Sequence, residues 1–187
     1  AVGPGAKLLV QANLGSSVVC APIKNGPSTG DFSGNLTILG DHPATTVLSL
    51  LEIFGSIIGG NFDIIGNVGT INIAHSLDTD LVIHGTLASL LVGTDPDQNN
   101  DTLGGTFTVE GTLNNVTVTG SLTGHLLVKG NATTISVNAD PDTSGTNLID
   151  SAATIDIQGT LSTLNVNGGN IGGSVVAGKN IAKASVN

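Results

Sequence analysis

Hydrophobic and polar residues alternate along this chain in short units. The commonest unit has nine or ten residues and reads roughly L-x-x-φ-x-φ-x-G-[TSN], where φ is a β-branched residue or Leu. The two φ positions are two residues apart, so their side chains point to the same face of a strand. The Gly and its polar neighbour predict a corner, because Gly adopts backbone angles that other residues avoid. One segment, residues 45–60, fits either a short helix or an elaborated corner.

A longer repeat contains these units. Three similar segments begin at Leu77, Leu122 and Ile171, and a second set begins at Gly60, Gly105 and Ala153. A weaker copy begins at Ser33, and residues 7–21 resemble its opening half. We therefore expect one β-solenoid domain over residues 1–187, with clear repeats in 32–187. Residues 1–31 are either the first coil or an N-terminal cap.

Strands this short need neighbours, because even a two-stranded hairpin is marginal in water. Stacking successive turns of chain pairs the backbone groups and places equivalent side chains above one another. Two flavours of unit alternate, so two units, about 19–20 residues, form the favoured coil. This coil predicts seven to nine turns in a rod of roughly 35–45 Å. A four-unit coil explains the 45-residue spacing between Leu77 and Leu122 equally well.

Composition and charge exclude several classes of function. Aromatic residues make up 2% of the chain, Met, Trp, Tyr and Arg are absent, and the net charge is −9. Nucleic-acid binding needs a basic face or aromatic stacking platforms, so we expect no nucleic-acid partner. No apolar run approaches the roughly 18 residues of a membrane span. Cys20, the single cysteine, is expected to behave as a buried small apolar residue, with an intermolecular bridge as the alternative.

The segments GTLNNVTVTGSLTGHLLVKGN and IQGTLSTLNVNGGNIGGSVVAGKN carry a family resemblance. They resemble the glycine-punctuated repeats of bacterial surface β-helix proteins, which include filamentous-haemagglutinin-like and autotransporter-passenger-like adhesins. The resemblance spans about residues 32–187 and implies a right-handed parallel β-helix that is secreted to the cell surface. It assigns no functional residue.

Two acidic loops are the candidate metal sites. They occupy equivalent places in successive long repeats, so we expect both to project from the same side of the solenoid. Carboxylate, amide and hydroxyl oxygens at alternate positions of a turn suit Ca²⁺, which takes six to eight oxygen ligands. Solvated acidic turns without metal are the simpler interpretation. The candidate ligands are Asp95, Asp97, Asn99, Asp101, Asp140, Asp142 and Ser144.

We expect no catalytic site. Asp63, Glu110 and Asp156 fall at matched or adjacent repeat positions, but they alternate with apolar residues and are expected to face solvent. His84 precedes a corner glycine and is also predicted to point outward. Enzymes that act on polysaccharides and resemble this architecture often pair clustered carboxylates with Arg or Lys; this chain has no Arg, so Lys would have to stabilise the charge. Phe62 and Phe107 are expected to stack in the core.

The sequence therefore predicts a non-catalytic structural protein. The apolar strand patterns lie close to both ends of the repeat region, without an evident polar cap, and an uncapped coil favours contact with another copy. We expect an extracellular solenoid that joins end to end into a filament or surface coat. Two alternatives compete with end-to-end contact: the chain is a fragment of a longer passenger, or its first 30 residues fold over one end as a cap. The alternatives are an adhesin rod that presents its loops to a cell-surface glycan or protein, and a polysaccharide-active β-helix enzyme.

Overall fold

The protein is described by a computed structural model over residues 7–10, 17–20, 30–40, 45–95, 101–140 and 147–187. These residues form β-strands, bridges and turns and contain no helix. Residues 46–53, for which a helix was one expectation, form a strand. The described part of the chain has no helix that is long and apolar enough to cross a membrane.

The strands form three parallel sheets. Sheet I contains β1 (Lys7–Val10), β3 (Asn35–Leu39), β5 (Asn61–Ile65), β7 (Asp80–Ile83), β10 (Thr106–Val109), β13 (His125–Val128), β16 (Thr154–Ile157) and β19 (Ser174–Ala177). Sheet II contains β2 (Ser17–Cys20), β4 (Thr46–Ile53), β6 (Asn67–Ile73), β8 (Leu87–Val92), β11 (Leu113–Thr119), β14 (Ala132–Asn138), β17 (Leu161–Asn167) and β20 (Ile181–Val186). Sheet III contains β9 (Thr102–Leu103), β12 (Ser121–Leu122), β15 (Asn147–Ile149) and β18 (Asn170–Ile171).

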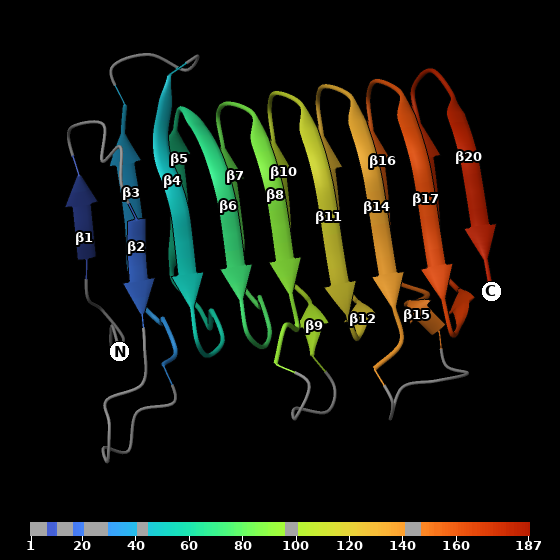
Figure 1. The fold of residues 1–187 in the computed structure, drawn as a ribbon, viewed down its shortest axis with the longest axis horizontal. Helices are drawn as coiled ribbons and strands as arrows, with labels where there is room; N and C mark the ends of the chain where they lie inside the picture. Colours follow the sequence, from blue (N-terminus) through green and yellow to red (C-terminus); the bar gives the residue numbers. More distant parts are fainter. Residues whose placement is uncertain (1–6, 11–16, 21–29, 41–44, 96–100, 141–146) are drawn as a thin grey trace.

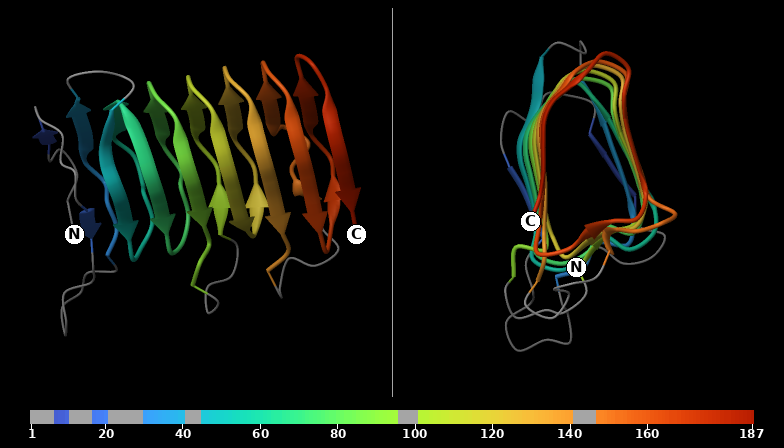
Figure 2. Two further views of the ribbon diagram at one scale, coloured as in Figure 1. Left: turned by 45° about the horizontal axis from the view of Figure 1, so that its top comes forward. Right: turned by 90° about the vertical axis from the view of Figure 1, so that its right-hand side faces the viewer.

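Successive coils place one strand in each long sheet, so the chain winds into a rod (Figure 1). The sheet II strands run down the near side, the sheet I strands run up the far side, and the coil advances from the N-terminal to the C-terminal end of the rod. This is the path of a right-handed parallel β-helix, which confirms the predicted fold class. Seen along the rod, the coil has two long sides and one short side (Figure 2).

The register of the sheets confirms the two-unit coil and rejects the four-unit coil. Phe62 pairs with Leu81 and Phe107 with Leu126, so these coils contain 19 residues. The coil from Leu81 to Phe107 contains 26 residues, because a loop is inserted after β8. A short coil and a long coil together give the 45-residue repeat. The two flavours of unit belong to the two long sheets.

Inward-facing residues form columns, in which each residue lies at the same register position of successive coils. Alternation along the strands of sheets I and II from β3 to β17 buries roughly every second side chain, and the buried set is almost wholly aliphatic. One column of sheet I contains Leu36, Phe62, Leu81, Phe107, Leu126, Ile155 and Val175. The backbone of Leu8 occupies the same register position in β1. Phe62 and Phe107 share this column, but Leu81 lies between them. The ring of Phe62 instead packs edge-on against Phe32, with 4.8 Å between centroids.

The glycines at the corner between sheets I and II are also stacked. The amide of Gly111 donates to the carbonyl of Gly85, and that of Gly130 donates to the carbonyl of Gly111. A Cβ at Gly130 would lie 2.4 Å from the oxygen of Gly111. The sequence correctly predicts corners at these glycines. The reason differs from the expected one, because close approach of two backbones, and not a left-handed conformation, requires glycine here.

Candidate functional site

A chain of charged side chains crosses the outer surface of sheet I. His84, Glu110 and Lys129 follow β7, β10 and β13 directly, and Asp63 lies within β5. The Nε2 of His84 is 2.9 Å from the Oδ1 of Asp63, and its Nδ1 is 2.9 Å from the Oε2 of Glu110. The Nζ of Lys129 donates to the Oε1 of Glu110 at 2.6 Å. We call these four residues the charged ladder.

The charged ladder adjusts the acidity of its own members. Partial burial alone would lower the pKa of His84, but the hydrogen bonds that its ring makes to the carboxylates of Glu110 and Asp63 outweigh burial and raise the pKa above 6.5. The hydrogen bond from Lys129, followed by that from His84, lowers the pKa of Glu110 below 4.5. Positive and negative groups therefore alternate over four adjacent coils in mildly acidic solution.

The geometry of the ladder suits cross-linking of coils better than acid–base chemistry. Both nitrogens of the His84 ring are occupied by carboxylates of neighbouring coils. A general acid or base needs a nitrogen within hydrogen-bond reach of its substrate, and this arrangement leaves none. The side chains are about one-third to one-half exposed, so solvent screens their attraction.

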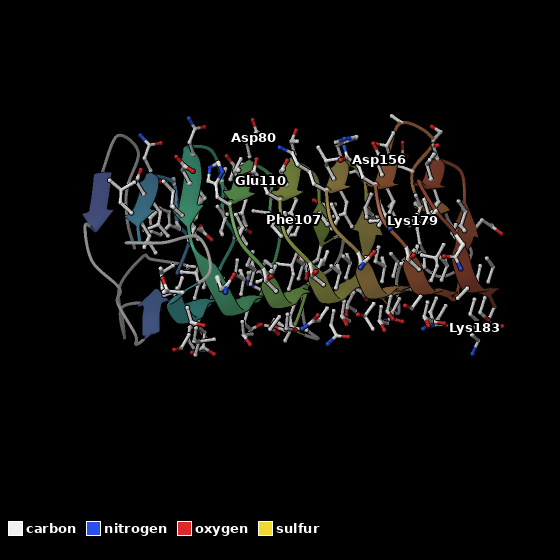
Figure 3. All side chains as sticks on the ribbon, turned by 90° about the horizontal axis from the view of Figure 1, so that it is seen from above. Asp80, Phe107, Glu110, Asp156, Lys179 and Lys183 are labelled. Carbon is white, nitrogen blue, oxygen red and sulfur yellow. The ribbon has the colours of Figure 1, made fainter. Side chains whose placement is uncertain are left out.

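The structure brings together two of the three strand acids identified in the sequence. Asp63 and Glu110 contact the same imidazole, and His84 points outward as predicted. Asp156 occupies the register position of Asp63 but is separated from it by three intervening coils. Figure 3 shows Glu110 and Asp156 on the outer side of the sheet, whereas Phe107 points between the sheets.

A second cluster lies at the base of the acidic loops. Asp101 and Asp140 are buried, with exposed fractions of 4% and 5%. The Nδ1 of His75 lies 3.9 Å from the Oδ1 of Asp101 and has no hydrogen-bond partner among the described residues. Burial, followed by repulsion from Asp140 and Asp95, raises the pKa of Asp101 to about 6, although His75 acts in the opposite direction. Two carboxylates predicted to lie in solvated turns are therefore buried.

The sequence contains a feature that could have predicted the position of His75 near the acidic loop. In the alignment of the segments from Gly60 and Gly105, His75 stands at the position of Gly120. The coil that contains Asp101 lies between these two residues, and the amide of Ser121 donates to the carbonyl of Asp101. The repeat alignment thus indicates that His75 lies near the first acidic loop. Its contact with Asp101 becomes evident only when the coils are stacked in register.

Replacing Asp101 with Asn is expected to stabilise the protein at pH 8. The folded-state pKa of about 6 lies above the ordinary 3.8. The carboxyl therefore stabilises the fold below pH 3.8, and this contribution is lost as the pH rises through 6. That difference corresponds to at most about 3 kcal/mol, and we expect a gain of about 1 kcal/mol, because the amide of Asn is itself a polar group that is costly to bury. Urea unfolding at pH 8 and pH 4 measures it.

The matched control is Asp150→Asn, which removes a carboxylate from an exposed turn. A gain of stability at pH 8 that is as large for Asp150→Asn as for Asp101→Asn would show that general charge reduction, and not the buried site, is responsible. A loss of stability in Asp101→Asn would contradict the unfavourable burial of its charge.

Calcium binding by the acidic loops stays a prediction. Among the candidate ligands, Asp97, Asn99, Asp142 and Ser144 lie outside the described residues. Asp101 is coupled electrostatically to both Asp95 and Asp140, so these three described candidates lie near one another. Within the described ranges, no group of three or more His, Cys, Asp or Glu side chains is arranged to hold a metal ion.

An open pocket lies beside the first acidic loop. It has a volume of about 280 Å³ and is lined by Phe54, Ala74, Thr94 and Asp95. The ring of Phe54 is 45% exposed, and the hydroxyl of Thr94 donates to the Oδ1 of Asn72. The sequence pattern does not predict this pocket, because its lining residues follow the ends of three successive sheet II strands, β4, β6 and β8.

The fold defines the chain as a parallel β-solenoid built from stacked two-strand units. No protein-family model, curated protein or solved structure matches the chain.

Proposed function

We propose that the protein is a non-catalytic structural rod that associates end to end with copies of itself into an extracellular filament or surface coat. The observation that carries this proposal is the exposure of apolar residues at inward register positions of β20 (Ile181–Val186), an edge strand of sheet II. Val166 is fully buried, whereas Val186, at the same register position one coil later, is 51% exposed. Ile181 is 37% exposed, although its neighbour Leu161 is fully buried.

Exposed core positions and unpaired strand edges favour association, because an open edge is a template for another strand. Contact between opposite ends of the rod is heterologous, so it propagates into a filament unless the rotation closes a ring. The surface location rests on the resemblance of the repeats to those of bacterial surface β-helix proteins. The occupied nitrogens of His84 support a structural rather than a catalytic role for the charged ladder.

Negative-stain electron microscopy of the purified protein tests the proposal. We expect filaments whose axial repeat is near the length of one solenoid, roughly 38 Å for eight coils about 4.8 Å apart. Ile181→Glu places a charge at an exposed core position and is expected to abolish the filaments. Ser185→Glu adds the same charge to the outer face of the same strand and should leave them intact.

Other images would favour other functions. Dispersed rods of unchanged β-structure would overturn self-association and favour an adhesin that presents its loops to a glycan or protein. Filaments that are lost equally in both variants would place the contact on the outer face of sheet II and not at the coil end.

A further inference from the structure

Both long sheets have an open edge at each end of the described rod. Strands β19 and β20 are the outermost strands at one end, and β1 and β2 are the outermost at the other (Figure 1). All strands within a sheet are parallel, so the two ends present backbone groups of matching polarity. The edge strands at one end of a rod can therefore continue the parallel backbone hydrogen bonding of another rod.

We infer that copies join coaxially in the register that relates the coils within one copy. In this arrangement β20 pairs with β2 of the next copy and β19 pairs with β1, and the solenoid continues across the junction. The inference rests on the proposed function and deepens it, because it names the strands that meet and the residues that come into register.

The sequence at the register positions of the inward columns favours this register, because these positions are apolar in β1 and β2 as well as in β19 and β20. The column of sheet II that ends at Val186 contains Cys20, Ile53, Ile73, Val92, Val118, Val137, Val166 and Val186. Continued stacking therefore places Val186 beside Cys20 of the next copy. In the same way it places Val175 beside Leu8 and Ala184 beside Val18. Small or β-branched residues of the last coil meet apolar residues of the first.

The charges at the two ends are compatible with the same register. All 14 acidic residues lie between Asp31 and Asp156, so none of them lies in β1, β2, β19 or β20. Lys7 belongs to the column that ends at Ser174, and Lys183 belongs to the column that begins at Ser17. In-register stacking thus places each of these lysines beside a serine. Sliding the junction by one residue would instead move apolar residues to the outer face.

A disulfide test follows from the position of Cys20, because it is the only cysteine of the chain. Adjacent strands lie about 4.8 Å apart, and disulfides bridge Cα atoms about 4.4–6.8 Å apart. In Val186→Cys, each copy carries two thiols, Cys20 in β2 and the new cysteine in β20. Each junction therefore brings the new thiol of one copy beside Cys20 of the next. Mild oxidation of the assembled protein is expected to give a ladder of dimers, trimers and higher species on a non-reducing gel, and reductant should collapse it to monomer.

Two controls isolate the register. Ser185→Cys moves the new thiol by one residue to the outer face of the same strand, and we expect at least tenfold less of the ladder. Val186→Cys combined with Cys20→Ser leaves one thiol per copy and should yield no species beyond dimer. The pair Leu8→Cys and Val175→Cys, made in Cys20→Ser, tests the same register in sheet I and should restore the ladder.

The outcomes separate this inference from the function on which it rests. Filaments without cross-links from either cysteine pair would overturn the register and leave end-to-end association in place. Dispersed rods without cross-links would overturn both. A ladder from Ser185→Cys that equals the ladder from Val186→Cys would contradict in-register stacking, even if the filaments are unchanged.

Discussion

Replacing Phe107 with Ala is expected to lower the free energy of unfolding by about 3–5 kcal/mol, the range for removing a buried aromatic ring. The side chain is fully buried and lies in its column between Leu81 and Leu126. Both neighbours belong to rigid coils, so the cavity left by the ring cannot collapse easily. Urea unfolding followed by circular dichroism measures the loss.

Thr108→Ala is the matched control for this substitution. Thr108 follows Phe107 in the same strand but points outward, so its replacement should change stability by no more than about 0.5 kcal/mol. Equal losses in the two variants would mean that the strand is sensitive to any change of sequence and that burial in the column is not the cause. A loss of less than about 1 kcal/mol in Phe107→Ala would show that the column repacks.

The columns are the part of the fold that could be predicted from the sequence. Leu81, Leu126 and Val175 align as equivalents in the long repeat, and the structure places all three in one column. The prediction succeeds because the period of two and the corner glycines depend on local sequence alone. The single error in this column concerns Phe62 and Phe107, which align in the 45-residue repeat but belong to coils with a further coil between them.

The charged ladder could not be predicted from the sequence pattern. Its members are separated by 19 to 26 residues along the chain and meet only because the inserted loops leave the register unchanged. When the start and end of each coil are unknown, the sequence shows His84 only as a single histidine that is expected to face outward. The same holds for His75 and Asp101, whose contact depends on which residues lie one coil apart. Local patterns predict which residues face inward, whereas contacts between neighbouring coils require the exact length of each coil.

The corner glycines lead to the second large effect. Gly130→Ala is expected to destabilise the protein by about 2–3 kcal/mol, because overpacking a tightly packed site forces the backbone to move. The added Cβ would lie 2.4 Å from the oxygen of Gly111, which accepts the hydrogen bond from the amide of Gly130. Relieving the clash therefore separates the two coils and weakens that bond. Thermal and urea unfolding measure the loss.

The control is Thr133→Ala, which changes an exposed residue in the next strand and should alter stability by no more than about 0.5 kcal/mol. If Gly130→Ala unfolds like the wild type, the corner can widen freely and the close approach of the coils is not required. A loss near the expected size would instead show why glycine recurs at this corner, since each coil there rests its backbone directly on the backbone of the one before. Such a contact leaves no room for any side chain, and the glycine column is then as much a part of the packed structure as the aliphatic columns that fill the interior.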